Sequence, residues 1–220
     1  KDTFWELIAQ AKDACGQRQE ETADWLTEHL LEMGPEQALN FHSIMQGYME
    51  LSDKFGLWNA AVLILEDGCY SDGFEDFRGW LIAQGKETYL AALKAPDSLA
   101  DIAAAMKDGC RFGAIVYVGE NAYEELTGRD AFSDDDRRFS EELRRDIVYG
   151  EGIDYPHEWS EVAAYLPRLT AQHLTPEGLR ACIRRGHLWN HDDPTIQKAR
   201  MAAPKKKTAR IEKKKGGKSR

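Results

Sequence analysis

Cysteine is scarce in this sequence, and long apolar runs are missing from it altogether. The four cysteines, Cys15, Cys69, Cys110 and Cys182, lie far apart and form no CxxC pair. Their spacing argues against a zinc knuckle or a disulfide framework and indicates reduced thiols. No apolar stretch reaches the roughly 18 residues that a membrane-spanning helix needs, so no membrane segment is expected. With no charged-then-apolar leader at its start, the chain is expected to be cytoplasmic.

The sequence also lacks the short motifs of several common enzyme classes. It contains no GxSxG elbow of a serine hydrolase, no GxxxxGK[ST] phosphate loop, and no GxGxxG after a strand. The cysteines have no recognisable catalytic signature around them. These absences leave no known site for a cofactor, and none is predicted.

The net charge of −9 conceals two regions of opposite sign. Residues 205–220 contain nine Lys or Arg and one acid, a charge of +8, so the remaining residues carry −9 − 8 = −17. A flexible cationic segment binds polyanions by releasing their counterions, and without aromatic side chains it would do so non-specifically. The alternative is that the tail folds back onto the acidic body. The lysines expected to make either contact are Lys205, Lys206, Lys207, Lys213, Lys214 and Lys215.

The most apolar part of the chain is predicted to form a helical hairpin. In the helix expected over residues 57–66, only Asn59 and Glu66 share a polar line, so most of its circumference should be buried. Gly68 ends this helix, and good capping residues at 71–72 are expected to begin the next one. A hairpin this apolar should lie at the centre of the fold.

Helical patterns dominate the rest of the chain, which predicts a mainly α protein with a compact multi-helix orthogonal bundle. Residues 1–172 are expected to form the helical domain and residues 173–195 a short helical extension. Residues 196–220 are expected to be a disordered Lys-rich tail, because they contain no aromatic residue. One segment stays open: residues 114–127 read as helical, but their IVYV run could instead be a strand.

The hairpin sequence FGLWNAAVLILEDGCYSDGFEDFRGWLIAQG, with TFWELIAQA, AYEELTG and LPRLTAQ elsewhere, resembles the bacterial domain-of-unknown-function 4240 family. The resemblance covers about residues 2–172. It brings no established activity with it. Some relatives of that family are joined to modules associated with regulatory proteins, and this implies a regulatory or interaction role.

The candidate binding residues gather around the hairpin turn and are Trp58, Asp67, Asp72, Arg78 and Trp80. On a helical wheel Arg78 lies at the edge of the apolar stripe, where a guanidinium needs a carboxylate or carbonyl partner. It could make a structural ion pair with Glu75 or Glu66. It could instead bind an anion in a cleft beside Trp58 or Trp80.

Two groups of residues could suggest a metal site, and neither is predicted to bind one. Asp72 and Asp76 fall opposite the apolar face of their helix, where solvated carboxylates are expected. His187 and His191 have HxxxH spacing, but Gly186 makes the stretch a turn, and the glutamate of a metalloprotease helix is missing.

The leading functional hypothesis is a non-catalytic regulatory or protein-interaction module with an unidentified protein partner and no contact with membranes. The second is an enzyme, a small-molecule hydrolase or transferase, built from Arg78, Asp67, Asp72 and His42. His42 is otherwise expected to be a surface residue, because it flanks an amphipathic stripe. The third is non-specific association with nucleic acid through the tail.

Overall fold

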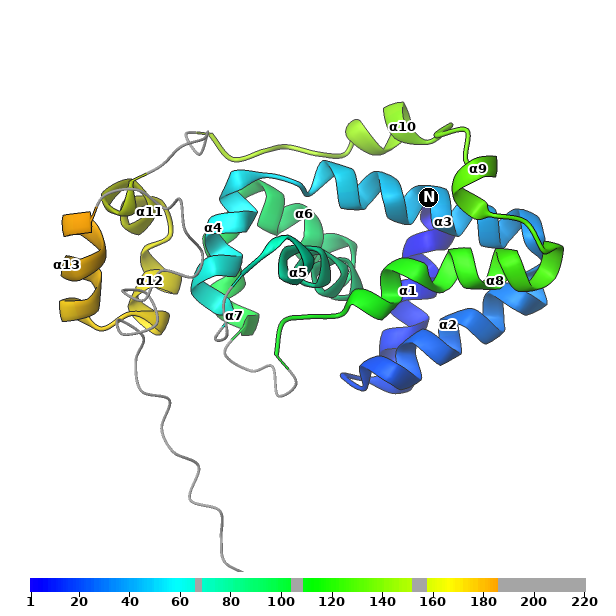
Figure 1. Cartoon of the computed structure of the whole chain (residues 1–220), viewed down its shortest axis with the longest axis horizontal. Helices are drawn as coiled ribbons and strands as arrows, with labels where there is room; N and C mark the ends of the chain where they lie inside the picture. The colour runs from blue at the N-terminus through cyan, green and yellow to red at the C-terminus, as the bar shows by residue number, and fades with distance from the viewer. Residues whose placement is uncertain (66–68, 104–108, 152–157, 186–220) are drawn as a thin grey trace, which may run out of the picture.

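The computed structural model describes residues 1–65, 69–103, 109–151 and 158–185. Within these ranges the chain is helical and has no β-strand, which confirms the mainly α class (Figure 1). Asp67, the pair His187 and His191, and the lysines of the tail lie outside the described residues. So does Glu66, one of the two acids considered as a partner for Arg78.

Four helices form one end of the molecule (Figure 1): α1 (Asp2–Cys15), α2 (Gln19–Met33), α3 (Pro35–Leu51) and α8 (Val118–Thr127). Helix α8 packs against both α2 and α3. Gly119 allows this close approach, because a Cβ there would lie 2.7 Å from the backbone nitrogen of His42. Helices α8 and α3 therefore meet backbone to backbone.

The centre of the molecule holds the predicted hairpin, α4 (Phe55–Ile64) and α5 (Ser71–Ala83), followed by α6 (Lys86–Lys94), a 3-10 turn η1 (Pro96–Leu99) and α7 (Ala100–Ala103). Val62 and Leu63 of α4 are 3% and 1% exposed, as expected for a helix that is apolar nearly all round. The hairpin is therefore the core that its sequence predicts.

Aromatic side chains join the first group of helices to the centre. The indole nitrogen of Trp5 on α1 donates a hydrogen bond of 2.9 Å to the hydroxyl of Tyr48 on α3. The hydroxyl of Tyr89 on α6 donates to the backbone carbonyl of Tyr48 at 2.7 Å. Tyr48 thus provides acceptors for both partners, its hydroxyl for Trp5 and its backbone carbonyl for Tyr89, while the three rings fill the core.

Three short helical segments run along one side of α3: η2 (Gly113–Tyr117), α9 (Ala131–Asp134) and α10 (Ser140–Arg144). The IVYV run is neither a strand nor a plain α-helix. Its first three residues complete the 3-10 helix η2, and its last residue begins α8.

The last three helices within the described residues are α11 (Trp159–Tyr165), α12 (Pro167–His173) and α13 (Pro176–Arg185). Pro167 occupies the first turn of α12, where its missing N–H costs nothing, and it separates α12 from α11. Helix α11 packs on α12 and α13, and α12 contacts α4. Among the described helices, none combines the length and the apolar character needed to cross a membrane.

Candidate functional site

A polar cavity of about 330 Å³ lies between α3, α5 and the segment that follows α8. Helix α3 contributes Ser43, Gln46 and Glu50 to its lining, and α5 contributes Glu75 and Arg78. The volume falls at the lower end of the range of about 300–1,000 Å³ typical of small-molecule sites. We call this space the Arg78 cavity.

Arg78 is held in place by a hydrogen bond and a cation–π contact. Its Nη1 donates to the backbone carbonyl of Met49 at 2.7 Å. Its guanidinium carbon lies 4.8 Å from the ring centre of Phe74, a cation–π contact. Its Nε is buried and has no hydrogen-bond partner among the described residues. Of the partners expected from the sequence, the carbonyl is the one observed.

Gln46 supplies a second buried donor on the facing helix. Its Nε2 is also buried without a hydrogen-bond partner among the residues that the structure describes. Leaving a buried donor unpaired costs about 1–3 kcal/mol, and both nitrogens are buried away from the cavity, so this cost belongs to the packing of the two helices.

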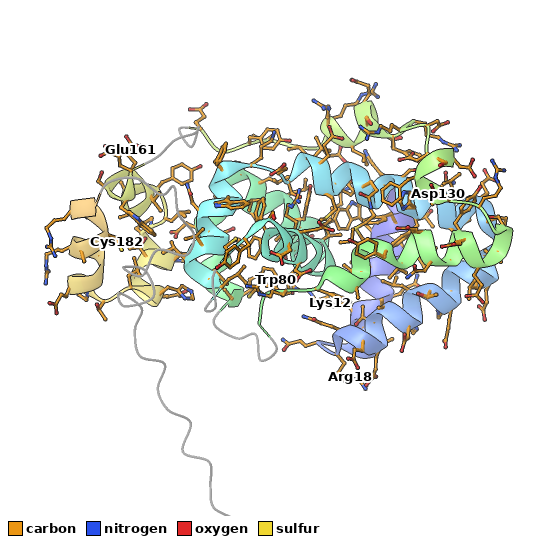
Figure 2. The ribbon with its side chains drawn as sticks, in the orientation of Figure 1. Lys12, Arg18, Trp80, Asp130, Glu161 and Cys182 are labelled. Carbon is orange, nitrogen blue, oxygen red and sulfur yellow. The ribbon has the colours of Figure 1, made fainter. Side chains whose placement is uncertain are left out.

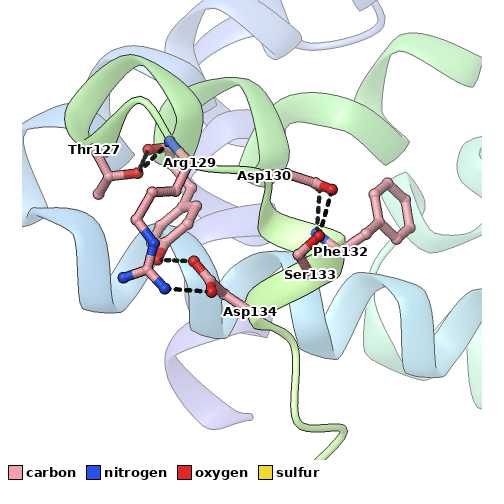
Figure 3. A network of polar contacts seen from close by, with 7 residues as sticks. Thr127, Arg129, Asp130, Phe132, Ser133 and Asp134 are labelled. Atoms are coloured by element: carbon pink, nitrogen blue, oxygen red, sulfur yellow. Dashed lines mark hydrogen bonds and ion pairs between the residues drawn. The ribbon is translucent and has the colours of Figure 1, made fainter.

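Figure 3 shows the polar contacts of the turn after α8, which leads into the segment that lines the cavity. The carboxylate of Asp130 caps α9, accepting hydrogen bonds from the backbone nitrogen of Phe132 at 2.9 Å and the hydroxyl of Ser133 at 2.7 Å. These bonds stabilise the charged form and lower the pKa of Asp130. Asp134 accepts from the Tyr123 hydroxyl at 2.7 Å and pairs with Arg129. Phe132, a lining residue, is set by this network.

A hydrogen bond then connects this lining segment to α3. The Oδ1 atom of Asp135 accepts from the Ser43 hydroxyl at 2.7 Å and from the backbone nitrogen of Arg137 at 2.9 Å. Arg137 has φ of 51°, a left-handed conformation that costs a non-glycine residue about 1–3 kcal/mol. Its Nη1 lies 3.7 Å from the Glu50 carboxylate across the mouth of the cavity.

The lining has charges of both signs. Among the described lining residues, Glu50, Glu75 and Asp135 carry carboxylates, and Arg78 and Arg137 carry guanidinium groups. The Oε1 atom of Glu75 accepts from the hydroxyl of Tyr117 at 2.9 Å, and this bond raises the pKa of that tyrosine. Each of the two helices thus contributes a donor and a carboxylate to the lining: Gln46 and Glu50 on α3, and Arg78 and Glu75 on α5.

His42 lies next to the cavity and is fully buried, so the expectation of a surface histidine is wrong. Helix α8 covers its side of α3 at Gly119, and Phe132 packs edge-on against its ring at 4.6 Å between centroids. Burial lowers the pKa of His42, and the charges of Asp135 and Asp130 partly oppose that shift. Neither ring nitrogen has a hydrogen-bond partner among the described residues.

The other predicted site residues do not meet in the Arg78 cavity. Trp58 packs edge-on against Phe74, with ring centroids 4.6 Å apart. Trp80 is 2% exposed and borders a different space of about 380 Å³, together with Lys12. Figure 2 labels both residues near the junction of α5 and α1. Asp72 is exposed at the start of α5 and is not part of the cavity lining.

Asp76, also on α5, lies beside the segment that precedes η2. The backbone carbonyl of Asp76 accepts from the nitrogen of Phe112 at 2.8 Å, which holds the segment before η2 along α5. Partial burial raises the pKa of Asp76, and the nearby charge of Arg111 acts in the opposite direction. The guanidinium of Arg111 also packs against Gly73, where a Cβ atom would collide with it.

Sequence reasoning missed the contribution of α3 to the cavity. Ser43, Gln46 and Glu50 are spaced by three and four residues, so they form one polar line on that helix. This line could have been read beside the apolar stripe of the same helix. The outer wall, from Phe132 to Ser140, carries no comparable pattern.

The comparisons with known proteins give a family and no activity. No curated protein and no solved structure matches the chain. A family model described as "Protein of unknown function (DUF4240)" matches residues 1–125, a shorter stretch than the resemblance read from the sequence. The match includes Arg78 and the α3 side of the cavity but ends before Phe132 and Asp135. Since it spans more than half of the 220 residues, the chain belongs to the DUF4240 family of proteins of unknown function.

Proposed function

We propose that the protein is a non-catalytic regulatory module that binds a small polar ligand in the Arg78 cavity. One observation carries the proposal: a guanidinium, that of Arg78, and an amide side chain, that of Gln46, line the same polar cavity from two helices. Arg78 is also oriented in advance by Met49 and Phe74, so little conformational entropy is lost when a ligand binds.

The lining supports binding better than catalysis. The hydroxyl of Ser43 donates to Asp135, and that of Ser140 donates at 2.9 Å to the backbone carbonyl of Arg137. The described lining contains neither histidine nor cysteine, so it has no nucleophile paired with an imidazole base. Of the residues predicted for an enzyme, Arg78 lines the cavity, His42 is buried beside it, and Asp72 lies apart.

The protein-interaction part of the proposal concerns the surface near the hairpin turn. Trp80 is buried and cannot anchor a partner there. Tyr70 is 47% exposed and Asp72 and Trp58 are at least partly exposed, so these three side chains would supply the contacts. Because α5 carries both Asp72 and Arg78, ligand binding could be transmitted to this surface through one helix.

The test is a screen of small polar metabolites for compounds that raise the melting temperature of the full chain, followed by calorimetric titration of those that do. We expect at least one compound to bind, and Arg78→Gln to weaken its binding by at least about tenfold, or 1.4 kcal/mol. Gln46→Met, which keeps the side-chain length but removes the amide, should weaken it in the same direction.

The matched control is Arg18→Gln. Arg18 precedes α2, is exposed, pairs with Glu21 and is not among the described residues that line the cavity. It should bind the compound as the unchanged protein does. The proposal is wrong if no compound in the screen binds, or if Arg78→Gln binds as tightly as Arg18→Gln.

A further inference from the structure

We infer that the Lys-rich segment 205–220 docks on one acidic surface of its own chain, formed by α5, η2, α8 and the turn after α8. Two exposed aromatic side chains, Tyr117 and Phe132, lie on this surface among carboxylates. The carboxylates are those of Glu75, Asp76, Glu120, Glu124 and Asp130. We call it the Tyr117 surface. Docking there requires no ligand in the Arg78 cavity, so it goes beyond the proposed function.

Tyr117 is at the centre of this surface. It is 43% exposed, and its hydroxyl donates to the Oε1 atom of Glu75 at 2.9 Å. This hydrogen bond raises the pKa of the tyrosine, and burial and the charges of Glu75, Glu120 and Asp76 add to the shift. Charges act strongly only on groups that are close to them, so three carboxylates lie around one exposed ring.

Glu120 connects this group of carboxylates to the turn after α8. Burial raises the pKa of Glu120, and the charges of Asp130 and Glu124 raise it further. On the α5 side burial also raises the pKa of Asp76, with Arg111 as the opposing charge. Neighbouring carboxylates disfavour one another's charged form, and a cation that binds between them relieves this repulsion.

Phe132 provides a second exposed ring at the other end of the surface. It is 52% exposed, and its backbone nitrogen donates to the Asp130 carboxylate at 2.9 Å (Figure 3). The face of an aromatic ring attracts an ammonium group, and the methylene stem of a lysine can cover the ring while its charged end stays in water. Exposed rings among carboxylates are therefore suited to lysine side chains.

Charge and chain length identify the segment that binds there. Residues 205–220 carry +8, whereas the remaining residues carry −17. Residues 186–204, nineteen in number, connect the segment to the end of α13, and an extended chain of that length spans about 60 Å. A compact chain of 185 residues has a radius of gyration of about 16 Å, so the connection is long enough to reach the Tyr117 surface.

Helix α2 is a second acidic surface and serves as the comparison. Its carboxylates Glu20, Asp24 and Glu28 are exposed. Its aromatic rings are less available than Tyr117, because Trp25 and His29 stack on each other with centroids 3.5 Å apart. If charge alone attracted the Lys-rich segment, it would contact both surfaces alike.

The experiment is carbodiimide crosslinking of the full chain, followed by mass spectrometry. The reagent joins a lysine amine to a carboxylate that lies in contact with it, so it reports directly which acids the segment touches. An equal mixture of ¹⁵N-labelled and unlabelled chains distinguishes crosslinks within a chain from crosslinks between chains. Reactions at about 20 mM and about 500 mM NaCl test the contribution of charge, because salt screens exposed charges.

We expect the lysines of residues 205–220 to react with Glu75, Asp76 and Glu120 at least about fivefold more often than with the α2 carboxylates. These crosslinks should form within one chain and should decrease at the higher salt concentration.

A double variant, Glu75→Gln with Glu124→Gln, tests whether the carboxylates act together. It keeps an acceptor for the Tyr117 hydroxyl, and it should reduce the crosslinks at the unchanged Asp76 and Glu120 by at least about threefold.

The matched control is Glu20→Gln with Glu28→Gln, which removes the same charge from α2. It should leave the crosslinks on the Tyr117 surface unchanged. Docking on this surface is wrong if the segment reacts equally with both surfaces, if it reacts with neither at low salt, or if the two double variants have the same effect. Crosslinks that form mainly between chains would show that the segment binds a second copy, which also contradicts docking on its own chain.

Discussion

Gly79 on α5 lies so close to Phe112 that a Cβ atom at this glycine would be 2.5 Å from the backbone carbonyl oxygen of Phe112. One turn earlier on α5, the carbonyl of Asp76 accepts from the nitrogen of Phe112. The segment that leads into η2 is therefore held against the helix backbone. Because Val116 of η2 lines the Arg78 cavity, this contact also positions one wall of the site.

Gly79→Ala should therefore destabilise the protein, even though alanine favours helix formation. The added methyl group meets a backbone oxygen that cannot rotate away, and overpacking of this kind costs about 1–3 kcal/mol. The free energy of unfolding in urea, measured by circular dichroism, would show the loss.

Gly47→Ala is the matched control for that substitution. Gly47 also lies within a helix, but its added methyl group would meet only the end of the Leu143 side chain, which can change rotamer. The gain in helix propensity of up to about 1 kcal/mol should then offset much of the contact. If both variants lose the same stability, the approach of Phe112 to Gly79 does not constrain this position.

The fold was predictable from sequence where the pattern of a single helix determines which of its side chains are buried. Helix α4 is apolar nearly all round, so Val62 and Leu63 had to be buried whatever packed on them. His42 shows the opposite case. It flanks the apolar stripe of α3 and would be exposed on a helix covered from one side. Helix α8 covers that flank as well, and this contact between segments far apart in sequence leaves no trace in the periodicity of α3.

The candidate site was predictable only in part for the same reason. Arg78 could be identified because a charged residue at the edge of an apolar stripe needs a partner. Its partner is the carbonyl of Met49, and every residue has a carbonyl, so sequence could not name it. Trp80 and Arg78 are neighbours on one helix but face different cavities. The grouping of site residues thus depends on tertiary packing more than on distance along the chain.

Tyr48→Phe should destabilise the junction of α1, α3 and α6. The hydroxyl of Tyr48 is the acceptor for the indole N–H of Trp5, and its removal leaves that buried donor unpaired at a cost of about 1–3 kcal/mol. Urea unfolding followed by tryptophan fluorescence measures the loss.

Tyr89→Phe serves as the comparison in the same aromatic cluster. Its hydroxyl donates to the carbonyl of Tyr48, which also accepts from the nitrogen and hydroxyl of Ser52. This acceptor keeps partners after the substitution, so we expect a smaller loss of about 0.5–1.5 kcal/mol. A loss in Tyr89→Phe that exceeds that in Tyr48→Phe would contradict this view of the cluster.

Deleting residues 205–220 should abolish any retention of the protein on duplex DNA at low salt. The tail carries nine basic residues and the rest of the chain is acidic, so non-specific attraction can come only from the tail. If it neutralises about eight phosphates, the logarithm of the association constant should fall with the logarithm of salt concentration with a slope of about −7. Fluorescence anisotropy across a salt series measures the slope. Equal binding by the truncated chain would show that the tail is not responsible, and absence of binding by the full chain would favour a tail that contacts its own acidic body.

The buried imidazole of His42 should make the protein less stable as the pH falls. Burial lowers the pKa of His42 in the folded state, whereas in the unfolded chain the pKa is about 6.5. Between these two values the unfolded state binds more protons, so the free energy of unfolding decreases as the pH falls below about 6.5 and levels off below the folded pKa. Asp130 and Asp135 limit the size of the effect, because their charges favour the protonated ring.

The control for this prediction is His42→Gln, which cannot titrate in this range. Asp76 and Glu120 have pKa values raised by burial, so they bind protons in the folded state and stabilise it on acidification. They are present in both proteins, and the comparison between the two proteins therefore isolates His42. The free energy of unfolding of the unchanged protein minus that of His42→Gln, measured in urea at pH 7.5, 6.5, 5.5 and 5.0, should decrease as the pH falls, because only the unchanged protein loses the histidine contribution. Parallel curves over this range would mean that His42 does not titrate differently in the folded and unfolded states.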